Sequence, residues 1–213
     1  MESLADQLLV LVLLVNFISL GSGQLVLSVR SVAVQGVALG LLPLLIYPAT
    51  HHLVGITAVI ILVKGIIIPL LIVKALDNAN ISREQSPLLG FVPTVIIGSL
   101  LTGLSFVFSE NLPLMPEHQR LMSVPTAIAT IMTGFLLLAT RRKAISQVIG
   151  YLILENGIFI FGMLLTSAMP FMVEAGVLLD LLVAIFVMGI VINQIGREFH
   201  SLDTSRLTSL KEE

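Results

Sequence analysis

Long apolar runs constrain the fold of this chain more than any other feature. A helix needs about 20 mostly apolar residues to cross the hydrocarbon core of a bilayer. Seven stretches of the sequence meet that requirement: roughly residues 4–29, 31–47, 52–75, 87–108, 121–140, 144–167 and 171–195. We therefore predict an all-α polytopic membrane protein with seven transmembrane helices.

The boundary between the first two spans has two interpretations. Gly21, Ser22 and Gly23 could form a loop, or they could lie as small residues inside one long tilted helix. We favour the long helix, because Arg30 then falls at a turn. The opening Met1-Glu2-Ser3 has no basic region and the apolar run after it is too long for a signal peptide. The first span is therefore expected to be retained.

Composition excludes several classes of protein. Charged side chains make up 11% of the 213 residues, against about 25% in an average soluble domain. An ordinary soluble enzyme is excluded, and so is a nucleic-acid binder, because no basic excess is present to meet phosphate. The chain has no cysteine, which excludes thiolate metal sites and iron–sulfur clusters. We see no phosphate loop or nucleophile elbow and expect no catalytic residue, cofactor or metal.

The basic residues predict the orientation of the chain, because Lys and Arg gather on the cytoplasmic side of membrane proteins. With seven spans, one side receives all of the Lys and Arg residues except Arg120, which lies on the other side, and Lys64, which lies inside the membrane. The residues on the basic side are Arg30, Lys74, Arg83, Arg141, Arg142, Lys143, Arg197, Arg206 and Lys211. We therefore predict an outside N-terminus and a cytoplasmic C-terminus.

A faint internal repeat and a change in polarity suggest the domain organisation. At an offset of about 112 residues, the repeat pairs Leu25, Arg30 and Gln35 with Leu137, Arg142 and Gln147. This offset suggests a 3+1+3 arrangement with parallel repeats, although two apolar helices flanking a basic turn also often look alike. We expect a transmembrane domain over residues 1–196 and a polar cytoplasmic tail over residues 197–213, which could be solvated or could meet a partner.

Ionisable residues inside the spans are the strongest candidates for function, because a charge at the bilayer centre costs about 2.5–3.5 kcal/mol on insertion scales. Lys64, Glu155 and Asp180 lie near the middle of the third, sixth and seventh spans, and Glu174 lies nearer the outer face. We predict that they form a lateral proton-transfer path. The alternative is that Lys64 and one acid form a buried ion pair that only holds the helices together.

Polar and irregular residues extend this interpretation. Asn156 adjoins Glu155 and Gln147 lies two turns away on the same span, so both could hold waters along the path. Each could instead make an interhelical hydrogen bond, which is what we expect of Asn16, Gln24 and Gln35. Pro69 removes a helix hydrogen bond, and a kink there could open a polar pocket beside Lys64.

The segments that contain these residues resemble those of a known protein family. The segments from Gly150 to Gly157 and from Val173 to Asp180 are distinctive. Together with the segments Lys64 to Leu70 and Leu202 to Lys211, they resemble the hydrogenase-4 component E family. The likeness runs essentially from end to end. That family belongs to energy-converting hydrogenase and formate hydrogenlyase complexes, so the resemblance implies a bacterial or archaeal inner-membrane location.

Residues 121–195 are also similar to the three-helix K-type subunit of respiratory complex I, which has a basic turn and then glutamates on its second and third helices. Leu152 stands at the place of the second-helix glutamate, with Glu155 one turn further on, and Asp180 is the acid at matching depth on the third helix. The resemblance implies a subunit without a redox centre that couples electron transfer to ion translocation.

The implied partners are the lipid bilayer, antiporter-like membrane subunits, and cytoplasmic hydrogenase-like and iron–sulfur subunits. Two other functions stay open on the sequence alone. The chain could be a structural scaffold of the same complex, or it could be a stand-alone secondary ion transporter.

Overall fold

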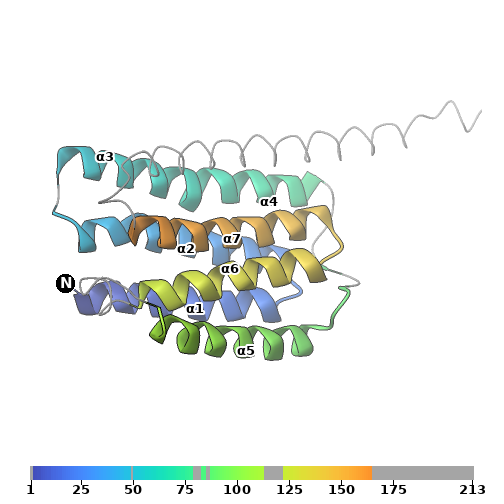
Figure 1. The fold of residues 1–213 in the computed structure, drawn as a ribbon. Coiled ribbons are helices and arrows are strands. Elements are labelled where there is room, and N and C mark those ends of the chain that lie inside the picture. Colours follow the sequence, from blue (N-terminus) through green and yellow to red (C-terminus); the bar gives the residue numbers. More distant parts are fainter. Residues whose placement is uncertain (1, 49, 79–82, 85–86, 113–121, 165–213) are drawn as a thin grey trace, which may run out of the picture.

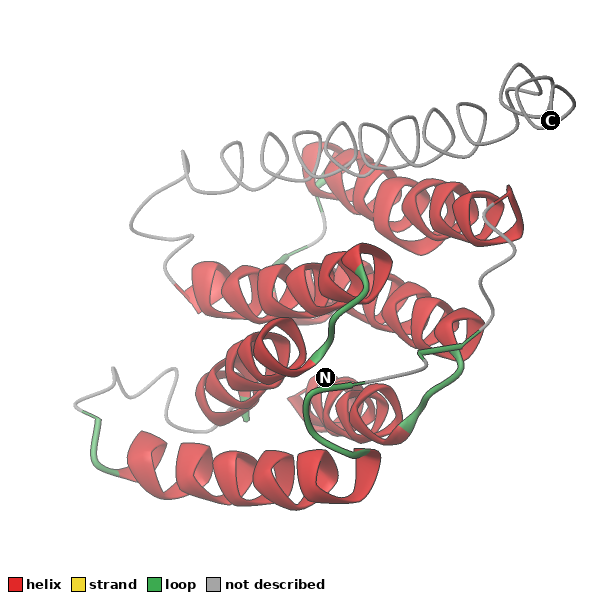
Figure 2. Ribbon diagram, turned by 90° about the vertical axis from the view of Figure 1, so that its right-hand side faces the viewer, coloured by secondary structure: helices red, strands yellow, loops and turns green. Residues whose placement is uncertain are grey.

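A computed structural model describes the chain except for residues 1, 49, 79–82, 85–86, 113–121 and 165–213. The regular structure of the described part is helical, with no strand in it (Figure 2). Its helices are α1 (Glu2–Gly21), α2 (Leu25–Ile46), α3 (His51–Ile60), the π-helix η1 (Ile61–Ile67), α4 (Ile68–Asn78), α5 (Phe91–Glu110), α6 (Ser123–Thr140) and α7 (Ala144–Leu164).

Six of the predicted spans have a helix in the described residues, with α3, η1 and α4 forming one continuous span; residue 121 and residues 165–167 at the ends of two of them lie outside the described part. All six helices are long and apolar enough to cross a membrane. Helices satisfy their own backbone polar groups, which is what a bilayer demands. The chain is therefore a multi-pass membrane protein. The seventh predicted span, residues 171–195, lies outside the described residues, and so do the predicted site residues Glu174 and Asp180.

The first break does not lie where we predicted it. α1 ends at Gly21 and α2 begins at Leu25, so residues 22–24 form a turn in which the Ser22 hydroxyl accepts the Gln24 N–H at 3.0 Å. Glycine and serine are weaker helix formers than the flanking apolar residues. Gly23 also lies against the Phe91 ring, where a Cβ would come within 2.8 Å of the ring. Arg30 is consequently an exposed residue inside α2.

We call the end of the bundle that holds the turns at residues 22–24 and 141–143 the basic end, and the other the far end. Residues 87–90, predicted to begin the fourth span, instead belong to a segment that lies across the basic end. The Glu84 N–H donates to Gly23 O at 2.9 Å, and the Leu88 N–H donates to Thr140 O at 2.8 Å. The segment therefore joins two turns that are distant in sequence.

Arg141 and Glu84 place buried charges at this end. The Arg141 guanidinium donates to Leu20 O at 2.9 Å and lies 4.7 Å from the centre of the Phe91 ring. Glu84 accepts a hydrogen bond from the Ser146 hydroxyl. Burial lowers the pKa of the Arg141 guanidinium and the Glu84 carboxylate opposes that shift. The Glu84 carboxylate thus offsets part of the cost of burying Arg141 where the loops close the bundle.

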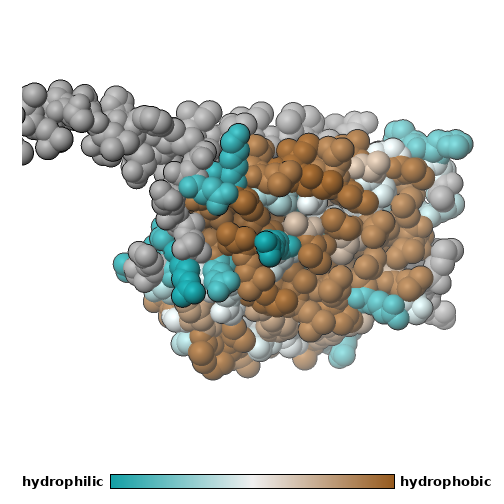
Figure 3. Space-filling view, turned by 180° about the vertical axis from the view of Figure 1, so that it is seen from behind, coloured by the Kyte–Doolittle hydropathy of each residue, from teal (hydrophilic) through white to brown (hydrophobic). Residues whose placement is uncertain are grey.

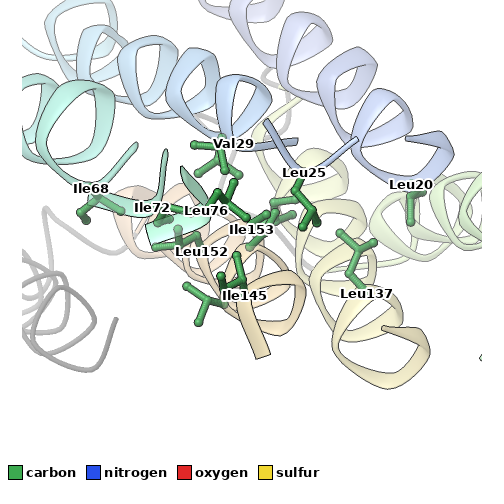
Figure 4. Close-up of a cluster of buried hydrophobic side chains, with 13 residues drawn as sticks. Leu20, Leu25, Val29, Ile68, Ile72, Leu76, Leu137, Ile145, Leu152 and Ile153 are labelled. Carbon is green, nitrogen blue, oxygen red and sulfur yellow. The ribbon is translucent and has the colours of Figure 1, made fainter. Parts of the chain in front are cut away.

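The helices pack in successive layers. Figure 1 shows the α3–α4 span on one side, then α2 with α7, then α1 with α6, and α5 on the opposite side. α1 and α6 run in the same direction, and so do α2 and α7. An apolar cluster near the basic end joins five spans, through residues that include Leu20, Leu25, Ile72, Leu137 and Ile153 (Figure 4). The surface seen from behind is mostly apolar, with most hydrophilic residues toward its ends and one small hydrophilic patch within the apolar area (Figure 3).

Two glycines of α2 let the span with Lys64 approach closely. A Cβ on Gly36 would lie 2.8 Å from the Cβ of Lys64, and a Cβ on Gly40 would lie 2.4 Å from Ile61. The pair has the G-x-x-x-G spacing that brings membrane helices together. Gly157 of α7 packs on α6 in the same way, since its Cβ would lie 2.6 Å from the backbone N of Ile131. Backbone contacts therefore fix where Lys64 lies.

Candidate functional site: a buried polar network at mid-membrane

Lys64 lies in the π-helix η1 in the middle of its span. At the end of η1 the Ile68 N–H donates to Val63 O, five residues back. Pro69 follows at once and has no N–H to continue the regular ladder. We predicted a kink at Pro69 that could open a polar pocket beside Lys64; what the structure shows there is a wider turn directly before the proline. Such π-turns inside α-helices frequently mark functional sites.

Lys64 and Glu155 form an ion pair in the interior of the bundle. Lys64 Nζ lies 2.9 Å from Glu155 Oε1, and the two residues are 5% and 3% exposed. Nζ also donates to Asn156 Oδ1 at 3.3 Å and lies 5.2 Å from the centre of the Phe159 ring. A charge at this depth is costly unless it is paired. The structure therefore brings together the lysine and the acid that the sequence predicted to share a depth.

Hydrogen bonds continue from this pair across the bundle. Asn156 Nδ2 donates to Gln35 Oε1 at 3.2 Å, and Gln35 Nε2 donates to Asn16 Oδ1 at 2.7 Å. Asn16 Nδ2 then donates to Thr130 Oγ1 at 2.9 Å. We call these residues the mid-membrane network: Glu155, Lys64, Asn156, Gln35, Asn16 and Thr130. Each is at most 5% exposed.

The hydrogen bonds of the network all run in one direction, and at the Glu155 end one carboxylate oxygen has no hydrogen bond in the described part of the chain. Every side chain from Lys64 to Asn16 donates to the next one, and such chains polarise and strengthen their members. Its ionisable groups are Lys64 and Glu155. The second carboxylate oxygen of Glu155, Oε2, is buried and makes no hydrogen bond within the described residues. The network can therefore hold one mobile proton between an amine and a carboxylate, beside a fixed line of dipoles.

The structure joins some of the predicted site residues and separates others. Lys64, Glu155 and Asn156 lie together in the network. Gln147 is exposed at the basic end, where its Nε2 donates to Arg141 O at 3.2 Å. Glu174 and Asp180 lie outside the described residues. The described part of the chain contains no group of three or more His, Asp or Glu side chains that could hold a metal.

Asn16, Gln35 and Thr130 are the members that we did not predict as site residues. The prediction that Asn16 and Gln35 make interhelical hydrogen bonds is confirmed. Gln24 instead lies exposed in the first turn, where its backbone pairs with that of Arg83. The signal for Asn16 and Gln35 was present in the sequence, since each is a lone amide inside an apolar run. Threonine gives no such signal, because it is common in membrane helices.

Comparison with known proteins gives relatives that cover most of the chain. The chain is 30% identical to the uncharacterized protein Rv0085 of Mycobacterium tuberculosis over 86% of its own length and 85% of that protein. It is 27% identical to hydrogenase-4 component E of Escherichia coli K12 over 76% of each chain, and equally to that of Shigella flexneri.

No family model matches the chain, and no solved structure matches it either. The identity to Rv0085 and the length that it covers establish a common family. The chain therefore belongs to the family of the mycobacterial protein Rv0085, and hydrogenase-4 component E is its distant homologue.

Proposed function

We propose that this chain is a membrane subunit, without a redox centre, of a complex-I-like energy-converting hydrogenase or a related oxidoreductase in the inner membrane of a bacterium or archaeon. Its role is to supply a midplane proton-transfer path that couples electron transfer to ion translocation. The distant homology to a protein named as a hydrogenase component supports the assignment to such a complex. The partners are antiporter-like membrane subunits and cytoplasmic hydrogenase-like and iron–sulfur proteins.

The mid-membrane network is the observation that carries this proposal. Lys64 and Glu155 can share one proton in two ways, either as an ion pair or as a neutral amine and acid. Burial makes two charges expensive, so small changes in the distance between them or in their surroundings shift the balance. A movement transmitted from a partner subunit can thereby load or release a proton at the centre of the membrane.

The orientation and the seventh span belong to the same proposal. Basic residues gather at the basic end, which we place in the cytoplasm. Asp180 and Glu174 then extend the path from the seventh span, with Glu174 on the outer side. The three helices over residues 121–195 would correspond to the K-type subunit of complex I.

A scaffold role is the second candidate, and one observation favours it. Lys64, which forms the 2.9 Å ion pair, is also the residue on which Gly36 of α2 packs. This is expected of a pair that fixes the positions of the helices. The two candidates differ in what the charge does after assembly. A proton carrier needs an ionisable group at residue 155 for transport, whereas a scaffold needs the negative charge that pairs with Lys64 for assembly.

Replacing Glu155 with glutamine separates these roles. The amide keeps the shape and accepts a hydrogen bond from Lys64, and the Lys64 amine can give up its proton so that no charge is left without compensation. We therefore expect assembly but a loss of at least about tenfold in protons moved per electron transferred. Glu155→Asp should retain part of the translocation, and Glu110→Gln, at the exposed end of α5, should retain all of it. The measurement is proton uptake by inverted vesicles that contain the assembled complex, normalised to electron transfer.

If the Glu155→Gln complex assembles and pumps like the wild type, the proton-path proposal is wrong. If its loss of activity follows a loss of assembled complex, the scaffold role is correct instead. Ion transport by the purified chain alone, without partners, would show a stand-alone transporter.

A further inference from the structure

Helix α6 carries a line of buried hydroxyls that leads away from the mid-membrane network. Ser123, Thr126 and Thr130 follow one another at intervals of three and four residues, which places them on one face of the helix. Their exposed fractions are 2%, 0% and 0%. We call these three residues the hydroxyl ladder. Thr130 is the last member of the network and Ser123 begins α6 at the far end, so the ladder spans this half of the bundle.

The ladder lies on a helix that is joined to α1 at three levels. At the far end the Met122 N–H donates to Asp6 Oδ1 at 3.1 Å. At mid-depth Asn16 donates to Thr130, and at the basic end Arg141 donates to Leu20 O. α1 therefore follows α6 along its length. Asp6, which is partly exposed, stands at the far end of this α1–α6 seam.

The Ser123 and Thr126 hydroxyls of the ladder differ from those of α5, and they share with the Ser19 and Thr57 hydroxyls the lack of a hydrogen bond among the described residues. On α5 the Thr94, Thr102 and Ser105 hydroxyls donate to the carbonyl four residues back, at 2.7–2.8 Å. The Ser123 and Thr126 hydroxyls are buried and make no hydrogen bond with the described residues. Burying a hydroxyl without a partner costs about 1–3 kcal/mol, and ordered water is the usual partner of such groups.

We propose that the hydroxyl ladder is a gated half-channel that connects the mid-membrane network with the far face of the membrane. The seam is closed in this structure, because Thr126 is fully buried. When α1 and α6 part, water that enters regains the hydrogen bonds that Ser123 and Thr126 lack. This inference rests on the proposed function, and it adds the route by which a proton leaves or reaches the network.

The proton transfer needs no further reactant. Each water in the opened seam accepts one proton and passes another on, along a file of waters between the Lys64–Glu155 pair and the carboxylate of Asp6. The amide side chains of the network hydrogen-bond to these waters and carry no proton themselves. Ser123 and Thr126 accept and donate one hydrogen bond each, so they hold the waters in line without changing their own charge. No electron moves in this step.

Cysteine labelling tests the opening of the seam, since the natural chain has no cysteine. Thr126→Cys and Ala127→Cys are matched variants, because both residues are 0% exposed and are neighbours on α6. In membranes with the complex turning over, we expect a water-borne methanethiosulfonate reagent to modify the cysteine at 126 at least about tenfold faster than that at 127, since thiolate forms readily only where water reaches. Equal rates, or no reaction at 126 and at a cysteine replacing Ser123, would overturn the half-channel.

A second experiment tests whether the ladder serves transport. Thr126→Val keeps the shape but removes the hydroxyl, so we expect protons moved per electron to fall severalfold, while Thr126→Ser should restore them. Thr94→Val is the matched control, because Thr94 is also 0% exposed but bonds to its own helix. Full pumping by Thr126→Val would contradict the role of the hydroxyl ladder in transport. The role of the mid-membrane network would still be tested by Glu155→Gln. Full pumping by Glu155→Gln would instead contradict the proposed function itself.

Discussion

A Lys64→Met variant is expected to lose most of its assembled, folded protein. The change removes the cation that lies 2.9 Å from Glu155 and leaves a carboxylate buried in the bundle without compensation. Breaking a buried pair on one side costs about 3–5 kcal/mol, which is a large fraction of the stability of an ordinary domain. The measurement is the thermal stability of the purified chain in mild detergent, together with the yield of complex in membranes.

The matched control for this prediction is Lys74→Met. Lys74 lies on the same span, ten positions further along, but is exposed, so its loss should leave stability nearly unchanged. A double variant, Lys64→Met with Glu155→Leu, should recover stability, because apolar residues often replace a buried pair without cost. It should not recover proton translocation. Wild-type stability of Lys64→Met alone would show that the ion pair does not hold the native packing.

The second large effect is expected at Gly36, where even alanine is too big. A Cβ there would lie 2.8 Å from both the carbonyl carbon and the Cβ of Lys64. These atoms belong to the backbone and the root of the side chain, so they cannot move aside without shifting η1 away from α2. Overpacking of this kind costs about 1–3 kcal/mol. Gly36→Ala should therefore lower both thermal stability and proton translocation, because Lys64 moves with its helix.

Gly55→Ala is expected to change the thermal stability in the opposite direction to Gly36→Ala. Gly55 lies on the same span as Lys64, but a Cβ there would meet nothing within 4 Å. Alanine is favoured over glycine inside a helix by about 1 kcal/mol, so this variant should be neutral or slightly more stable. Equal stability of the two alanine variants would contradict the close approach of α2 to η1.

The sequence predicted the features of this bundle that the bilayer dictates. Apolar length predicts the described spans, and the energetic cost of a buried charge singles out Lys64 and Glu155 from the sequence alone. The turn at residues 22–24 was misplaced because Arg30 was assumed to need a turn, whereas an arginine near the end of a helix can lie on its exposed surface. A basic residue indicates a side of the membrane more reliably than it indicates a boundary.

The partners of the ion pair could not be predicted in the same way. Gln35, Asn16 and Thr130 join the network because α1, α2, α6 and α7 pack in a particular rotation. Glycine contacts fix how α2 meets the span with Lys64 and how α6 meets α7. Apolar length in the sequence does not specify these rotations. Gln147 was predicted from its distance along α7, but its side chain bonds to the turn at the basic end.

The proposed function requires Glu155 to change its protonation state when the complex works. Infrared difference spectroscopy of the assembled complex, with electron transfer switched on, detects this directly through the C=O stretch of a protonated carboxyl group. We expect such a band that shifts in heavy water, disappears in Glu155→Gln and persists in Glu110→Gln. A difference spectrum of Glu155→Gln identical to that of the wild type would show that this carboxylate keeps one protonation state and that the network only holds the helices in place.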